Sequence, residues 1–96
     1  MNVQFRPVPR DGIDLSETFI RRTNLSGANL ERANLSGADC SNALFVGANF
    51  KDAILAGTIL RGADLTGATN LTAAQIATAI IDKSTKLPDG LRPEIN

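Results

Sequence analysis

The feature that most constrains the fold of this chain is a large apolar residue at every fifth position over more than half of its length. Eleven consecutive blocks follow this rule without an insertion, and a small or β-branched residue usually stands two places before each large one. Period five fits neither the 3.6-residue repeat of a helix nor a long two-residue strand alternation. It fits a strand of about three residues followed by a turn. The large series is Leu15, Ile20, Leu25, Leu30, Leu35, Cys40, Phe45, Phe50, Leu55, Leu60 and Leu65, and the small series is Ile13, Thr18, Thr23, Ala28, Ala33, Ala38, Ala43, Ala48, Ala53, Thr58 and Ala63.

This spacing also predicts which side chains face the interior. In a strand of three residues the first and third side chains share one face, and the middle one points the other way. Both series are therefore predicted to face inward, and the Asn or Asp that often stands between them to face outward. Glycines such as Gly27 and Gly47 fall at corners, where a positive φ is useful. A corner after every block predicts four sides to a coil.

Charged residues are consistent with a coil of four blocks. With this coil length, Glu31 lies below Lys51 and Arg32 lies below Asp52. Opposite charges on neighbouring strands favour such a register, so two cross-coil ion pairs are predicted. Continued backward, the register places Gly12 at a corner. Residues 1–12 are thus predicted to form an irregular N-terminal half-coil before the solenoid at 13–67.

A different element is predicted after Gly67, where the five-residue register slips. Thr72 is a good helix N-cap, and Gln75 three residues later completes a capping box. The sequence predicts a short helix from Ala73 to about Ile81. Because a solenoid needs an atypical unit at its end, residues 68–96 are predicted to be a capping helix and tail.

The tandem blocks resemble the pentapeptide repeat family, whose pattern is A-[DN]-L-x-x. The resemblance is best seen at Ala28-Asn29-Leu30, Ala33-Asn34-Leu35 and Ala63-Asp64-Leu65. It implies an all-β fold, a right-handed quadrilateral parallel β-helix, here of about three coils. Four blocks depart from the pattern by placing an apolar residue at the outward position: Phe19, Leu44, Ile54 and Ile59.

Composition argues against several classes of partner. The chain has 96 residues, and its ten basic and ten acidic residues give a net charge of zero. A neutral chain has no electrostatic reason to bind nucleic acid or an anionic membrane. No apolar run approaches the ~20 residues that span a bilayer, and the start lacks a secretory pattern. We expect a cytoplasmic protein without nucleic-acid or membrane partners.

The residue types needed for catalysis do not converge. The chain has no His, and its carboxylates are scattered over different predicted sides. It contains no phosphate-binding glycine loop and no calcium loop. Cys40, the single cysteine, falls in the inward series, where an apolar environment keeps a thiol protonated. We therefore expect a non-enzyme with no catalytic, cofactor or metal site.

The outward apolar residues form a candidate interaction surface. The competing interpretation is that the tail at 82–96, through Leu87, Leu91 and Ile95, folds back over them. At the other end of the column Phe5 and Val8 are predicted to be exposed, which suggests a homodimer that meets through the N-terminal coil. The candidate surface residues are Phe19, Leu44, Ile54, Ile59, Phe5 and Val8.

Together these features favour a non-catalytic scaffold or protein–protein interaction module, whose partner the sequence does not identify. The alternative, implied by the quinolone-resistance members of the family, is a DNA mimic that acts on a type II topoisomerase. Mimicry needs a long and strongly acidic rod, whereas this column is short and neutral. A repeat unit without independent activity is a third interpretation.

Overall fold

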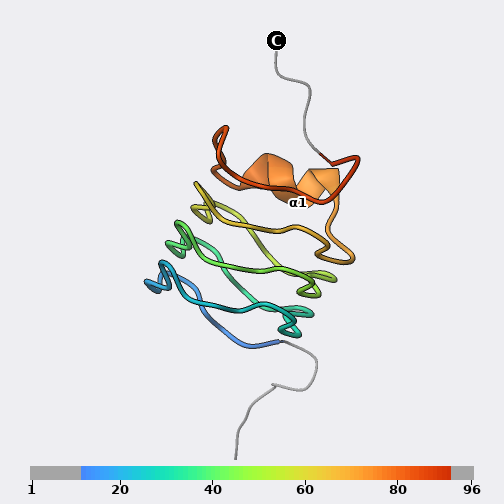
Figure 1. Ribbon diagram of the computed structural model, residues 1–96. Helices are drawn as coiled ribbons and strands as arrows, with labels where there is room; N and C mark the ends of the chain where they lie inside the picture. Colours follow the sequence, from blue (N-terminus) through green and yellow to red (C-terminus); the bar gives the residue numbers. More distant parts are fainter. Residues whose placement is uncertain (1–11, 92–96) are drawn as a thin grey trace, which may run out of the picture.

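The chain winds into a four-sided column of parallel β-bridges in a computed structural model that describes residues 12–91 (Figure 1). Each bridge joins positions one coil apart, such as 14 and 34, a separation of 20 residues. The predicted coil length is therefore confirmed. Each side contributes one bridging residue per coil rather than a longer strand. In chain order, the bridging residues are Asp14, Asn34 and Ile54 on the first side, Phe19, Asp39 and Ile59 on the second, Asn24, Leu44 and Asp64 on the third, and Asn29, Asn49 and Thr69 on the fourth.

Every coil is tied to the next by backbone hydrogen bonds that run along the column. On the first side the Asn34 N–H donates to the Ile13 carbonyl at 2.9 Å, and the Leu35 N–H donates to the Ile54 carbonyl at 2.9 Å. The same two bonds recur on the other sides. Because buried peptide groups must be paired, this ladder allows a narrow column to have a dry interior.

The corners are four-residue turns whose third residue is left-handed. The Ala28 N–H donates to the Leu25 carbonyl at 3.0 Å, and Gly27 between them has a φ of 75°. Positive φ recurs at every fifth position from 17 to 67. Six of these positions are the predicted glycines, whereas five carry other residues, a conformation uncommon outside glycine. Those five are Glu17, Arg22, Arg32, Asn42 and Asp52.

Gly12 corrects one detail of the predicted corners. It does not adopt the left-handed conformation found at the other corner glycines. Instead, a Cβ atom at this position would overlap the backbone of Glu31 in the next coil. Glycine is required here because the backbone of the next coil passes too close for a side chain. The five-residue spacing does not predict this contact.

The outward Asn and Asp residues hold the turns that follow them. In Asp39, Oδ1 accepts hydrogen bonds from the backbone N–H of Ser41 at 3.1 Å and from its hydroxyl at 2.6 Å. Such Asx turns are a local alternative to strand pairing and favour the change of direction. The same backbone bond is made by Asp14, Asn24, Asn29, Asn34, Asn49 and Asp64.

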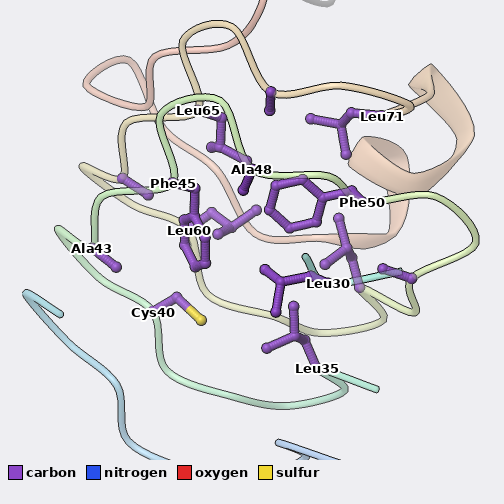
Figure 2. Close-up of a cluster of buried hydrophobic side chains, with 14 of the residues drawn as sticks. Leu30, Leu35, Cys40, Ala43, Phe45, Ala48, Phe50, Leu60, Leu65 and Leu71 are labelled. Carbon is purple, nitrogen blue, oxygen red and sulfur yellow. The ribbon is translucent and has the colours of Figure 1, made fainter. Parts of the chain in front are cut away.

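The interior is a stack of apolar layers, as both inward series predicted (Figure 2). The rings of Phe45 and Phe50 lie in one layer with centroids 5.4 Å apart and planes tilted by 59°. The inward residues of the second and third coils are buried, whereas in the first coil Leu15, Ile20 and Leu25 are only partly covered and Leu30 is buried. Ile13 departs from the prediction, because it is 55% exposed. Among the described residues, the first layer has a packed neighbour on one side only.

The two predicted cross-coil ion pairs do not form. Glu31 instead pairs with its neighbour Arg32 at 3.7 Å, and neither Lys51 nor Asp52 has an ion pair within residues 12–91. The register is correct, but these side chains lie at exposed corners where no geometry holds them together.

Helix α1, Ala73–Thr78, follows the last regular coil and lies at the end of the column (Figure 1). The predicted capping box between Thr72 and Gln75 is present. The helix is shorter than predicted because the chain returns to the ladder: the Ile80 N–H donates to the Thr58 carbonyl at 2.8 Å. Ile80 then bridges Ile59, 21 positions away. The helix therefore ends before the residues that return to strand pairing.

Gln75 replaces the strand that α1 displaces on the first side. In lower coils, the Ala33 carbonyl accepts from the Ile54 N–H; the equivalent Ala53 carbonyl faces α1 instead. Nε2 of Gln75 donates to it at 2.9 Å and to the Phe50 carbonyl at 2.8 Å. Its Oε1 meanwhile accepts from the Thr72 N–H at 2.7 Å. One side chain therefore caps the helix and completes the ladder.

Candidate interaction surface

Groups that could perform chemistry are occupied in building the fold. No three His, Cys, Asp or Glu side chains gather into a metal site within residues 12–91. Cys40 is fully buried, and burial, aided by the charge of Asp39, raises the pKa of its thiol to about 12. A thiol in that state is neither a nucleophile nor a metal ligand, so Cys40 serves as a core residue.

The outward carboxylates are likewise engaged by the turns. Hydrogen bonds from the Ser41 hydroxyl and then from its backbone N–H hold the pKa of Asp39 below its usual value. Asp64 has a lowered pKa for the same reason through Thr66. A carboxylate stabilised in its charged form is a poor general base, and these groups lie on different sides of the column.

The four apolar residues at outward positions are the exception to the repeat. Phe19 is 83% exposed and Ile54 is 48% exposed, while Leu44 is also exposed and Ile59 is half-buried. Hydrocarbon side chains have no oxygen to accept the hydrogen bond that the N–H of the following turn donates to Asn or Asp. These positions therefore lose a turn bond and place apolar surface in water, which points to a role outside the fold.

The tail does not cover these residues over the part of it that the structure describes. Leu87 and Leu91 are partly buried and pack against the core cluster instead. Ile54 and Leu44 stay exposed beside them. Residues Phe5, Val8 and Ile95 lie outside the described residues, as does most of the predicted N-terminal half-coil.

The structure brings three of the apolar residues to one region and leaves the fourth apart. Phe19 and Ile59 lie on the second side with Asp39 between them, and Ile54 lies across the neighbouring corner on the first side. Ile80 extends this group because it bridges Ile59 and is 37% exposed. The sequence did not single out Ile80, which it placed in the helix. Leu44 lies on the third side.

A shallow groove of about 270 Å³ opens beside Ile54, between the third coil and α1. It is lined by side chains of Ala56, Ala74 and Thr78 as well as by Ile54 and Gln75. The Leu55 N–H makes no backbone hydrogen bond within residues 12–91, but Leu55 is buried and only 1% exposed. The groove therefore offers mainly apolar walls.

Basic residues follow the edge between the second and third sides. Arg21 contacts Asp39 at 3.5 Å, which offsets the negative charge between Phe19 and Ile59. Arg22 and Arg61 lie on the same edge, are exposed and make no ion pair within the described chain. The apolar group thus has a positively charged border beside the first and third coils, and Asp82 follows on that edge next to Gly62.

Within residues 12–91, none of the helical structure is long or apolar enough to cross a membrane.

Comparison with known proteins agrees with the fold. A family model described as pentapeptide repeats matches residues 11–42, 33–69 and 43–79, with eight copies. No curated protein matches the chain. The family forms right-handed quadrilateral β-helices and is generally non-catalytic, consistent with the four ladders seen here.

Solved structures of the same kind are similar to the chain. The pentapeptide repeat protein Rfr23 from the cyanobacterium Cyanothece 51142 is 29% identical with a TM-score of 0.60, over 80% of this chain and 52% of that one. HetL from Nostoc sp. strain PCC 7120, a pentapeptide repeat protein involved in heterocyst differentiation regulation, is 25% identical with a TM-score of 0.46, over 86% of this chain and 47% of its own. The chain thus spans about half the length of these structures. With the repeat in the sequence, the four ladders of the column and the family match over residues 11–79, the chain belongs to the pentapeptide repeat family.

Proposed function

We propose that the chain is a non-catalytic module that binds another protein through its side wall. The observation that carries this proposal is the exchange of turn-forming Asn or Asp for apolar residues at Phe19 and Ile54, which are exposed, and at Ile59, which is half-buried. The exchange costs each of these blocks the side-chain hydrogen bond to its turn. Complementary apolar contact with a partner would remove this surface from water.

The column suits such a role because its wall is rigid. We propose that about three coils form the scaffold and that α1 acts as its C-terminal cap, since Ile76 of α1 is buried against the last layer. Every bridging residue of the second coil is paired above and below, as Asp39 is with Phe19 and Ile59. A partner therefore meets side chains held in fixed places, which lowers the ordering entropy lost on binding.

Three further expectations from the sequence remain proposals: a cytoplasmic location, self-association through the N-terminal coil, and the absence of DNA mimicry. Phe5 and Val8, on which the dimer depends, lie outside the described residues. Sedimentation of the full chain against a form that begins at residue 13 tests that dimer. A monomer at high micromolar concentration would argue against it.

Affinity capture from the native extract tests the interaction function with a matched variant. The double substitution Phe19→Asn with Ile59→Asp restores the family's own residue types, so the variant should fold at least as well as the natural chain. We expect a protein captured by the natural chain to be lost with this variant. The control Leu44→Asn makes the same kind of change on the third side. If the natural chain, the double variant and Leu44→Asn all capture a partner equally well, its binding site lies elsewhere on the chain. Failure of the natural chain to capture any specific partner would contradict the proposed function.

A further inference from the structure

Resting on the proposed function, we propose that the second side and its neighbouring corner bind an amphipathic helix of a partner protein that is apolar on one face and acidic along one flank. The binding surface consists of Phe19, Ile59 and Ile80 on the second side, and Ile54 beside the groove. Its charged border consists of Arg22 and Arg61. The inference goes beyond protein binding because it specifies the chemistry of the partner.

The apolar spacing on the second side matches one face of a helix. Phe19 and Ile59 are two coils apart, and neighbouring parallel strands are about 4.8 Å apart, so these residues are separated by roughly 10 Å along the column. Helix positions seven residues apart lie about 10.5 Å apart on one face. Ile80 bridges Ile59 and lies one strand beyond it toward the α1 end of the column, so it extends the contact. A helix that lies along the column can therefore contact all three residues.

A helix is favoured over an extended peptide because the wall above the first coil has no free strand edge within residues 12–91. The N–H of Asp39 donates to the Thr18 carbonyl and its carbonyl accepts from the Ile20 N–H, so both groups are bonded to the first coil. Ile59 is bonded in the same way to Ala38 and Cys40 of the second coil. Strand addition requires unpaired backbone groups at a sheet edge. Recognition on this side must therefore use side chains, as when an amphipathic helix lies on an apolar surface.

The acidic flank follows from the charges that border the apolar residues. Arg22 follows Phe19 by three positions and Arg61 follows Ile59 by two, so both lie on the same edge of the second side. Arg21 is already paired with Asp39, which neutralises the carboxylate within the surface. Arg22 and Arg61 make no ion pair within residues 12–91, so their guanidinium groups can attract carboxylates, with which they make charge-assisted hydrogen bonds.

Selection from a displayed library of random 16-residue peptides tests the inference without a known partner. Peptides that bind the full chain should combine apolar residues at helical spacing with Glu or Asp on one flank. Binding measured by fluorescence anisotropy should weaken about tenfold or more with Phe19→Asn and Ile59→Asp, as expected for central apolar contacts. The charge variant Arg22→Gly with Arg61→Ser should weaken binding less and remove most of its salt dependence.

Matched controls distinguish this inference from the broader function. Leu44→Asn on the third side should leave peptide affinity unchanged, and thermal unfolding should show that every variant is folded. Enrichment of basic peptides, binding unaffected by the variants, or no enrichment would overturn the inference. A folded partner that is captured through the second side while no acidic helical peptide binds would leave the proposed function standing and refute only the helix. If the natural chain self-associates and the variant Phe19→Asn with Ile59→Asp does not, the surface binds a second copy of this chain. That result would also refute the acidic helix.

Discussion

Single residues in the second coil show how a narrow interior is filled to even density. Its layer combines the rings of Phe45 and Phe50 with the small Cys40 and with Leu35, whereas the next layer is made of leucines alone. Protein interiors tolerate changes of shape only when the total volume is kept. Cys40 therefore provides the room that two adjacent rings require. The layer above consists of Leu55, Leu60, Leu65 and Leu71.

Replacing Cys40 by Leu alone should overfill this layer. We expect the single variant to lose about 1–3 kcal/mol of unfolding free energy, as added methylenes do in a packed core. The triple variant Cys40→Leu, Phe45→Leu and Phe50→Leu reproduces the all-leucine layer and should recover most of that loss. Urea denaturation measures both values. Equal stability of the natural chain and the single variant would show that Cys40 is not a volume compensator.

The left-handed corners give a second test at this scale. Gly47 has a φ of 72°, and an added Cβ would meet no atom within 4 Å. Gly47→Ala should therefore destabilise the fold by about 1 kcal/mol through backbone strain alone. The reverse change, Glu17→Gly at a φ of 59°, should raise stability by relieving that strain. Thermal melts compare the two; a neutral Gly47→Ala would indicate that these corners are not strained.

The sequence predicted which side chains face the interior better than it predicted which side chains contact one another. Five-residue spacing places each inward side chain relative to the backbone, and so the coil length and both series, apart from the exposed Ile13, were correct. It could not distinguish the corner at Gly27, which needs a positive φ, from the close approach at Gly12. The Glu31–Lys51 pair failed because exposed side chains choose among several partners of nearly equal energy. The outward apolar residues were found as breaks in the pattern, whereas Ile80 required the tertiary fold.

Among the elements, α1 depends on a side chain that serves two structures at once. Its six residues are too few to be stable alone. Gln75 provides the helix with a capping box and the ladder with a donor for the Ala53 carbonyl. The end of the predicted helix was wrong for a related reason, because pairing of Ile80 with Ile59 overrides a helical preference that continues to Ile81.

Gln75→Glu separates these two roles. The carboxylate can still accept from the Thr72 N–H, but it cannot donate to the Phe50 and Ala53 carbonyls, which it would also repel. We expect a loss of about 1–3 kcal/mol, the cost of buried acceptors left unpaired. Thr72→Ala, which removes only the cap, should cost about 1 kcal/mol. Denaturation midpoints measure both, and a larger effect of Thr72→Ala would assign the main role to the cap.

Across the whole molecule, Asx turns make stability depend on acid. Hydrogen bonds from Ser and Thr hydroxyls lower the pKa of Asp14, Asp39, Asp64 and Asp82. A lowered folded pKa means that the stabilisation is complete above the unfolded value near 3.9 and is lost as pH falls through the folded value. The column should therefore weaken below about pH 4.

Replacing these four Asp residues by Asn should flatten that dependence. Asn24 makes the same turn bond, its Oδ1 accepting from the Ser26 N–H at 3.0 Å, so the turns should survive. Urea melts from about pH 2 to about pH 7 compare the quadruple variant with the natural chain. An equally steep loss of stability in the variant would show that the turn carboxylates are not the source of the acid sensitivity.

The charge pattern of the whole column leads to a final prediction about the alternative function. A DNA mimic must present negative charge along its length, because the enzyme surfaces that bind DNA are complementary to closely spaced phosphates. Here the edge between the second and third sides carries Arg21, Arg22 and Arg61, and the net charge of the chain is zero. We expect the purified chain to inhibit DNA supercoiling by a type II topoisomerase no more than an unrelated neutral protein does, at low or high salt. Inhibition that fades as salt rises, and that weakens when the four turn Asp residues become Asn, would show that local acidity suffices and would replace protein binding with mimicry as the function of this column.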